Sequence, residues 1–238
     1  SLARQDWSLL PRIARAARAG AAGVIIRSNR LIYAIYPYDL PIPVVTVHST
    51  AWPKTTENVS VSVQLSANTR IQTQNVVGQI RGRQRPDSLV VLTAHYDHVG
   101  SLGREIVFPG ANDNASGTAM LLALARHFRQ HPHPYTIVFA AFSGEELGLL
   151  GSEHFAEHPP FDLSRVTFLL NFDMVASGTN GIMAVGGKTF PGAFERLAAV
   201  HDSLGLGPLA ARANARNSDH YPLTQQGIRG FFLYTRGG

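Results

Sequence analysis

This chain of 238 residues contains no cysteine. The absence excludes disulfide bonds, thiolate metal sites and a cysteine nucleophile, although it does not identify the compartment. No apolar run approaches the roughly 20 residues that a membrane-spanning helix needs, so no membrane span is predicted. The N-terminal stretch also lacks an apolar core after its basic residues, so no signal peptide is visible there.

Charge is sparse as well. Lysine and arginine number 21 against 16 for aspartate and glutamate, which is a formal net charge of +5. Arginines gather within residues 12–18 and 81–85, but no aromatic-rich reading motif accompanies them. We therefore interpret these stretches as solvated faces and expect no nucleic-acid partner.

The pattern of apolar residues predicts an α/β fold. The runs SLVVLTA, YTIVFAAF and RVTFLLNF have the length and composition of buried strands. Helical patterns cover residues 115–128, 145–158 and 192–205. The first of these is apolar nearly all round, which predicts a buried helix with Asn114 as its cap. This alternation predicts a mixed, mainly parallel central sheet covered by helices on both faces.

The N-terminal part follows a different pattern. Residues 7–19 have helical spacing, and short apolar runs predict strands at residues 23–26 and 42–47. Residues 59–65 alternate strictly between polar and apolar, which is typical of a half-buried strand. We therefore predict a small β-rich segment over residues 1–66 and a main domain over residues 67–238.

Polar residues stand at the ends of the predicted elements. In sheets of this class, ligands bind at the carboxyl ends of the strands. The polar residues directly after a strand or before a helix are His95, Asp97, Asp113, Glu145, Glu146 and Asp173. Four separate segments thus bring a carboxylate or an imidazole to one edge of the sheet.

Imidazole and carboxylate groups together are suitable ligands for zinc. Taken singly, each of these residues has an ordinary explanation, such as a helix cap or a local hydrogen bond. Their gathering at one edge predicts a metal site. Bound cations would offset the charge of the adjacent Glu145 and Glu146, with one glutamate binding metal and its neighbour free for proton transfer.

Five motifs then carry a resemblance to a known family. TAHYDHVG, GANDNASG, FSGEELGLLGS, NFDMV and SDHYPLTQQGI, in this order, resemble the co-catalytic dizinc aminopeptidases, which are zinc exopeptidases related to bacterial leucyl aminopeptidases and glutamate carboxypeptidase. The likeness covers roughly residues 75–238 and implies their phosphorylase/hydrolase-like fold. Upstream, AARAGAAGVII and IPVVTV resemble the latter half of a protease-associated domain, a β-rich insert that several members carry.

The resemblance implies the metal ligands. His95 and Asp173 would bind one zinc ion, Glu146 would bind the other, and Asp113 would bridge both. Cobalt or manganese would suit the same ligand chemistry, so the native metal is left open.

The resemblance also implies the catalytic roles. Glu145 would be the general base for a water activated by two zinc ions, and Asp97 would be the hydrogen-bond partner of His95. The peptide bond after the bridging aspartate, between Asp113 and Asn114, is often cis in this family.

One feature of the family is missing from the chain. The second zinc normally takes a further histidine from a segment after the strand that GFFLYT matches, and the chain stops at Gly238 before such a segment. We expect a truncated C-terminus. His220, in SDHYPL, is a candidate for a substitute ligand, and it lines the expected substrate pocket together with Ser218 and Asn217.

The expected function is zinc-dependent hydrolysis of N-terminal residues from peptide substrates. Three alternatives on the same fold stay open: a dizinc carboxypeptidase or deacylase, a single-zinc glutaminyl cyclase, and an inactive receptor-like binding module. The motif GANDNASG lacks the lysine typical of the deacylases, which favours the aminopeptidase. The resemblance suggests a secreted or periplasmic protein, and the oligomeric state is left open.

Overall fold

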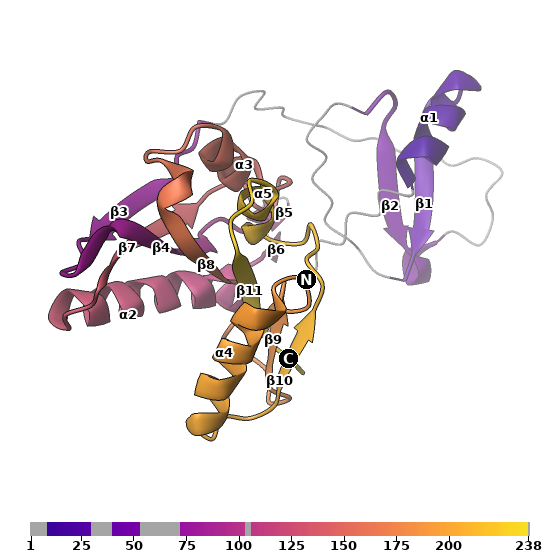
Figure 1. Cartoon of the computed structure of the whole chain (residues 1–238). Helices are drawn as coiled ribbons and strands as arrows, with labels where there is room; N and C mark the ends of the chain where they lie inside the picture. The colour runs from indigo at the N-terminus through magenta and orange to yellow at the C-terminus, as the bar shows by residue number, and fades with distance from the viewer. Residues whose placement is uncertain (1–8, 30–39, 53–71, 103–105, 238) are drawn as a thin grey trace. The chain divides into compact units, whose positions relative to one another are not determined.

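The computed structural model describes residues 9–29, 40–52, 72–102 and 106–237 (Figure 1). The chain divides into two compact units, Ser1–Gln72 and Thr73–Gly238, which are described separately. The predicted strand at residues 59–65 and the predicted boundary at 66–67 lie outside the described residues. No helix within the described ranges is long and apolar enough to cross a membrane.

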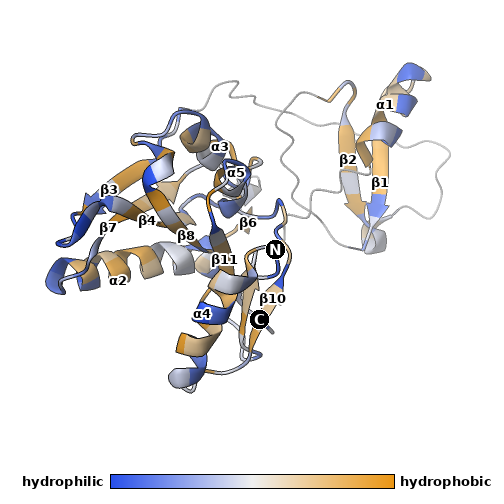
Figure 2. Ribbon diagram, viewed as in Figure 1, coloured by the Kyte–Doolittle hydropathy of each residue, from blue (hydrophilic) through white to orange (hydrophobic). Residues whose placement is uncertain are grey.

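The first unit contains one helix and one pair of strands. Helix α1 (Leu10–Arg18) is followed by β1 (Val24–Ser28) and β2 (Val44–His48), and these two strands pair in parallel. Both strands colour mainly as apolar in Figure 2. The predicted helix and strands are confirmed, and the likeness to a protease-associated domain stays a prediction.

The second unit is built on a sheet of seven strands. In order across the sheet, they are β10 (Leu209–Arg212), β9 (Ile182–Val185), β11 (Gly230–Thr235), β8 (Val166–Phe172), β4 (Arg85–His95), β7 (Tyr135–Phe142) and β3 (Val76–Ile80). Neighbouring strands are parallel except at the pairs β11–β9 and β3–β7, which are antiparallel. The predicted mixed, mainly parallel sheet is confirmed.

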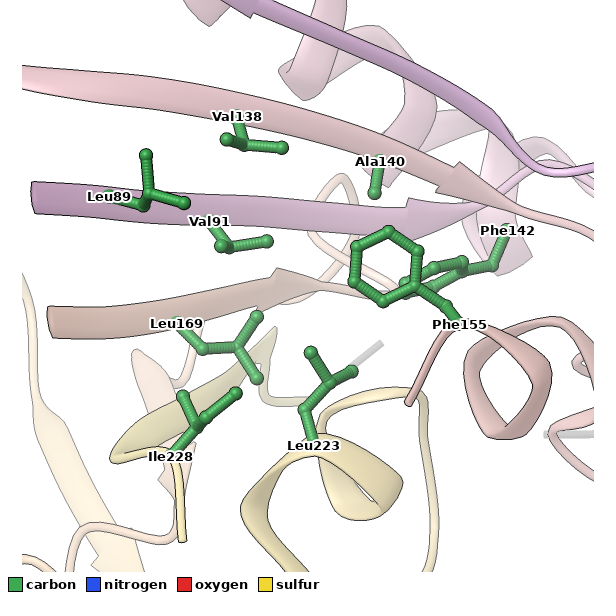
Figure 3. Close-up of a cluster of buried hydrophobic side chains, with 9 residues drawn as sticks. All are labelled: Leu89, Val91, Val138, Ala140, Phe142, Phe155, Leu169, Leu223 and Ile228. Carbon is green, nitrogen blue, oxygen red and sulfur yellow. The ribbon is translucent and has the colours of Figure 1, made fainter. Parts of the chain in front are cut away.

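Helices cover both faces of this sheet (Figure 1). Alternate residues of β4 point to opposite faces, as in any strand. Leu89 and Val91 belong to a core cluster with residues of α3 (Leu150–Glu157) and α5 (His220–Gln225), which Figure 3 shows. Leu92 belongs to a second cluster, on the side of α2 (Ser116–Gln130). Helix α4 (Pro191–Ser203) lies beside β10.

The prediction that α2 is a buried helix is wrong. Only Gly117 and Leu121 of α2 are buried, whereas Leu122 is 68% exposed, and both colours occur along α2 in Figure 2. The apolar composition of a helix does not reveal how many of its sides are covered. Asn114 does act at the start of the helix as predicted, because its Oδ1 accepts the amide hydrogen of Gly117 at 2.9 Å.

The predicted helix at residues 145–158 begins later than expected. Helix α3 starts at Leu150, and Glu145 and Glu146 lie in the preceding turn. Gly148 and Leu149 have φ angles of 107° and 69°, in the left-handed region that a right-handed helix cannot contain. The two glutamates are therefore held by a loop between β7 and α3.

Several short elements were not predicted from the sequence. These are β9, β10 and α5, together with the small antiparallel pair of β5 (Ser101–Leu102) and β6 (Ile106–Val107). None of them has more than six residues, so none produces a clear periodic pattern.

Candidate metal centre

Three side chains meet where β4, β8 and α2 come together. His95 is the last residue of β4, Asp173 directly follows β8, and Asp113 lies in the turn before α2, where its peptide bond to Asn114 is cis. The Nε2 atom of His95 lies 3.3 Å from Oδ1 of Asp113 and 3.4 Å from Oδ1 of Asp173. The structure thus brings these three predicted ligands within reach of one ion.

The distances in this group fit a metal ion better than hydrogen bonds. Two ligand atoms that each lie about 2.0–2.2 Å from a tetrahedral zinc are about 3.3–3.6 Å apart. Nε2 of His95 and Oδ1 of Asp173 are both buried, and neither has a hydrogen-bond partner of normal geometry among the described residues. Buried polar atoms without such partners are rare, and a cation between them would satisfy both.

A second group shares Asp113 with the first. Its other members are Glu146, from the loop after β7, and His98, three residues beyond the end of β4. Nδ1 of His98 lies 2.8 Å from Oε1 of Glu146. His98 was not among the predicted ligands, although its place in the motif TAHYDHVG, close to His95, was an available signal.

Asp97 connects β4 to the loop that carries both glutamates. Its two carboxylate oxygens accept the backbone amide hydrogens of Glu145 and Glu146 at 3.2 and 3.3 Å. Its carboxylate lies 3.7 Å from Nδ1 of His95, whereas its own carbonyl oxygen is closer, at 3.1 Å. The predicted contact with His95 is therefore made mainly through the backbone, and the carboxylate positions the glutamate loop.

Asn75 holds the same loop from the side of β3. Its Oδ1 accepts the amide hydrogen of Ser143 at 3.2 Å, and its Nδ2 donates to the carbonyl oxygen of Gly151 at 2.8 Å. One side chain thus connects the two ends of the segment that contains Glu145 and Glu146.

A buried chain of hydrogen bonds leads to Asp173. The hydroxyl of Ser218 donates to Oδ2 of Asp173, the amide of Asn171 donates to Ser218, and the hydroxyl of Thr93 donates to Asn171, each at 2.7 Å. Thr93, Asn171 and Ser218 are all fully buried. Ser218 therefore contacts a predicted ligand from behind and does not line an open pocket.

The carboxylates around His95 favour a positive charge. Burial alone would lower the pKa of His95, but the nearby carboxylates of Asp113, Asp173 and Asp97 outweigh it and raise the pKa well above its usual value. A metal ion would meet the same attraction, since an opposite charge nearby stabilises any cation.

Glu145 has a different environment from the ligand carboxylates. Burial raises its pKa well above the usual value, and repulsion from Asp219, Asp173 and Glu146 adds to this shift, while the nearby His95 opposes it. Its Oε2 lies 4.0 Å from Nε2 of His95, so it faces the first group without belonging to it. A carboxylate that resists ionisation beside a metal site is suited to accept and return a proton.

The segment 217–220 does not supply a ligand to either group. Asn217 is exposed, whereas His220 is fully buried and its ring centroid lies 5.5 Å from that of Phe232. Burial lowers the pKa of His220 to about 4, so the ring is neutral. Asp219, which was not among the predicted site residues, is also fully buried, and burial raises its pKa to about 7.

With this geometry established, comparison with known proteins identifies the family. Residues 75–237 match peptidase family M28, and the chain belongs to this family. It is 31% identical over 239 residues to aminopeptidase YwaD of Bacillus subtilis, an alignment that covers 95% of this chain and 51% of that protein. It is 32% identical over 179 residues to an aminopeptidase of Pseudomonas aeruginosa, covering 70% of this chain and 32% of that protein.

Solved structures agree with this assignment. The structure of a zinc aminopeptidase from Bacillus subtilis superposes with a TM-score of 0.77 at 30% identity, over 98% of this chain and 58% of that one. A glutaminyl cyclase from an Acidobacteriales bacterium superposes with a TM-score of 0.58 at 26% identity, over 66% of this chain and 57% of that one. The chain spans about half the length of the Bacillus relative that it matches.

Proposed function

We propose that this chain carries the active site of a zinc-dependent aminopeptidase that removes N-terminal residues from peptides. The observation that carries the proposal is the group of His95, Asp113 and Asp173, with unpartnered buried atoms directed at one point and Glu145 beside it. Membership of peptidase family M28 and the aminopeptidase relatives support the same reaction.

The proposed site would hold two ions. His95, Asp113 and Asp173 would hold one, while Asp113 and Glu146 would hold the other. When bound, zinc supplies a Lewis acid that polarises a carbonyl group and lowers the pKa of water. The predicted roles of these four residues as ligands are therefore part of the proposal.

Glu145 is the residue that would move the proton. Its partly buried carboxylate faces the first metal group and belongs to neither candidate ligand set. It would accept a proton from the attacking water and later return it to the amine that leaves. Asp97 would keep Glu145 in place, because it binds the backbone amide of Glu145.

A glutaminyl cyclase is the second candidate, because a solved structure with this activity is 26% identical to the chain. A single-zinc cyclase would need only one group of ligands, whereas the described residues contain two groups that share Asp113. The number of bound ions therefore separates the two functions.

Two measurements on the purified chain test the proposal. Elemental analysis should find two zinc ions per chain, and a panel of aminoacyl-anilides should be hydrolysed while N-terminal glutaminyl peptides are not cyclised. One zinc ion with cyclisation would favour the cyclase. Bound zinc without either activity would contradict both functions for this chain.

A further inference from the structure

Two residues outside the proposed ligand set each hold one oxygen of a ligand carboxylate. A carboxylate that binds a metal through one oxygen can still rotate unless a hydrogen-bond donor holds its other oxygen. Oδ2 of Asp173 accepts a hydrogen bond from Ser218, and Oδ1 is the buried atom that faces His95. Oε1 of Glu146 lies at hydrogen-bonding distance from Nδ1 of His98. A ligand carboxylate in each group thus has one oxygen in contact with a side chain outside the proposed ligand set.

The direction of the Ser218 hydrogen bond is determined by its neighbours. Thr93 donates to Oδ1 of Asn171, so the amide nitrogen of Asn171 is turned towards Ser218. A serine hydroxyl has a single hydrogen, and since Oγ accepts from Asn171, this hydrogen points to Asp173. Because all of these groups are buried, water does not compete for their bonds.

The His98 contact has the geometry of a hydrogen bond and not that of two ligands on one ion. Its length of 2.8 Å is shorter than the 3.3 and 3.4 Å separations around His95. Gly110 also leaves room for the ring, because a Cβ atom at this position would lie 2.8 Å from Cγ of His98. The absence of a side chain at Gly110 therefore allows the ring to reach Glu146.

We propose that Ser218 and His98 are positioning residues for two separate metal positions. Ser218 orients Asp173 in the group with His95, and His98 orients Glu146 in the group that shares Asp113. The inference rests on the proposed function only in requiring two bound ions. Loss of such a partner typically weakens metal binding by about 10–100-fold. Each substitution should therefore lower the affinity for one ion and leave the affinity for the other unchanged.

The test measures zinc affinity of the full chain by competition with a chelator. Asp173→Asn and Glu146→Gln serve as references, since each removes a ligand from one group and so identifies which binding step belongs to it. Ser218→Ala should weaken the step that Asp173→Asn abolishes, and His98→Ala should weaken the step that Glu146→Gln abolishes. Each variant is thus the control for the other.

Conservative variants separate positioning from a general effect on folding. The amide nitrogen of asparagine lies as many bonds from Cβ as Nδ1 of histidine, so His98→Asn should recover most of the affinity that His98→Ala loses. In each cobalt-loaded variant, the visible absorption of only one of the two bound cobalt ions should differ from that in the unaltered chain. Thermal unfolding in excess chelator should be the same for His98→Ala, His98→Asn and the unaltered chain.

Three results would overturn the inference. They are unchanged affinities in Ser218→Ala and His98→Ala, an equal loss at both metals in either variant, and a failure of His98→Asn to recover affinity. Binding of fewer than two ions by the unaltered chain would refute the two-metal function and the inference together. If the chain binds two ions and its variants show the selective losses of zinc affinity, but no peptide is hydrolysed, the proposed function is refuted and the inference stands.

Discussion

At the scale of single residues, the adjacent Glu145 and Glu146 are separated by their surroundings. The main chain of both is held by Asp97, yet only Glu146 joins a group of candidate ligands. Burial raises the pKa of each carboxyl group. Under the proposed function, these neighbours in sequence would take up the two separate tasks of binding metal and moving a proton.

Replacing each glutamate by glutamine should therefore have different effects. Glu145→Gln should lower kcat by about 10²–10⁴ and leave the zinc content unchanged, because only the proton acceptor is lost. Glu146→Gln should lower zinc content as well as activity, because it removes a ligand. Elemental analysis beside steady-state hydrolysis measures both effects, and an unchanged kcat in Glu145→Gln would exclude Glu145 as the base.

His220 makes a prediction about pH and stability. Its pKa is about 4 in the folded chain, against 6.5 for an unperturbed histidine. As the pH falls below 6.5, the unfolded chain takes up a proton that the folded chain refuses, so stability is lost. Between pH 7 and pH 5 this loss amounts to about 2 kcal/mol.

Urea unfolding of the unaltered chain and His220→Gln at both pH values measures this contribution. The variant should lose about 2 kcal/mol less than the unaltered chain on going from pH 7 to pH 5. Equal losses in the two proteins would show that His220 is not held neutral by burial.

The positions of single residues were predictable where they depend on the ends of strands. His95, Asp113 and Asp173 were selected because polar residues beside buried elements gather at one sheet edge, and the structure brings them together. The partnership of Thr93 with Asn171 depends on the register of β4 against β8, in which these two residues are opposite each other. Nothing in a single sequence reveals that register.

At the scale of elements, the long apolar strands were predictable and the helix boundaries less so. A run such as YTIVFAAF has one interpretation, and it forms β7 over its whole length. The start of α3 depends on the left-handed backbone at Gly148 and Leu149, and a leucine in the sequence does not predict that conformation. The exposure of α2 depends on which elements pack beside it, and these cannot be predicted from the residues of α2 alone.

Helix α2 also offers a test of its packing against β8. A Cβ atom on Gly117 would lie 2.2 Å from the carbonyl oxygen of Phe172 and 2.5 Å from Oδ1 of Asn114. Gly117→Ala should therefore destabilise the chain by about 1–3 kcal/mol, although alanine favours helices.

Gly192 is the matched control for Gly117. It lies in the first turn of α4, and a Cβ atom there would meet nothing within 4 Å. Gly192→Ala should stabilise the chain by about 0.5–1 kcal/mol, because alanine loses less freedom on folding. Chemical denaturation of both variants measures the difference, and opposite signs from those given would contradict the packing.

At the scale of the whole molecule, the predicted fold class is confirmed and the candidate metal centre joins distant parts of the second unit. Its carboxylates come from the turn before α2, the loop after β7 and the end of β8. Without cations, these like charges repel one another in a partly buried site, so the folded state should depend on metal.

Calorimetry of the chain with zinc and with excess chelator should show this dependence. An ion present at about 100 times its Kd stabilises the folded state by about 2.7 kcal/mol, which corresponds to a rise in Tm of roughly 5–10 °C for a chain of this size. An identical Tm in zinc and in chelator would contradict a metal centre at this place.

The membership of Asp113 in both groups has a consequence for the order in which ions enter. Two ions that share a carboxylate cannot bind independently, because the first alters the orientation and the charge that the second meets. By linkage, each must change the affinity for the other by the same factor, whichever enters first. The two binding steps would therefore be coupled while each position keeps its own affinity, and substitution of Asp113 should remove the coupling and weaken both positions.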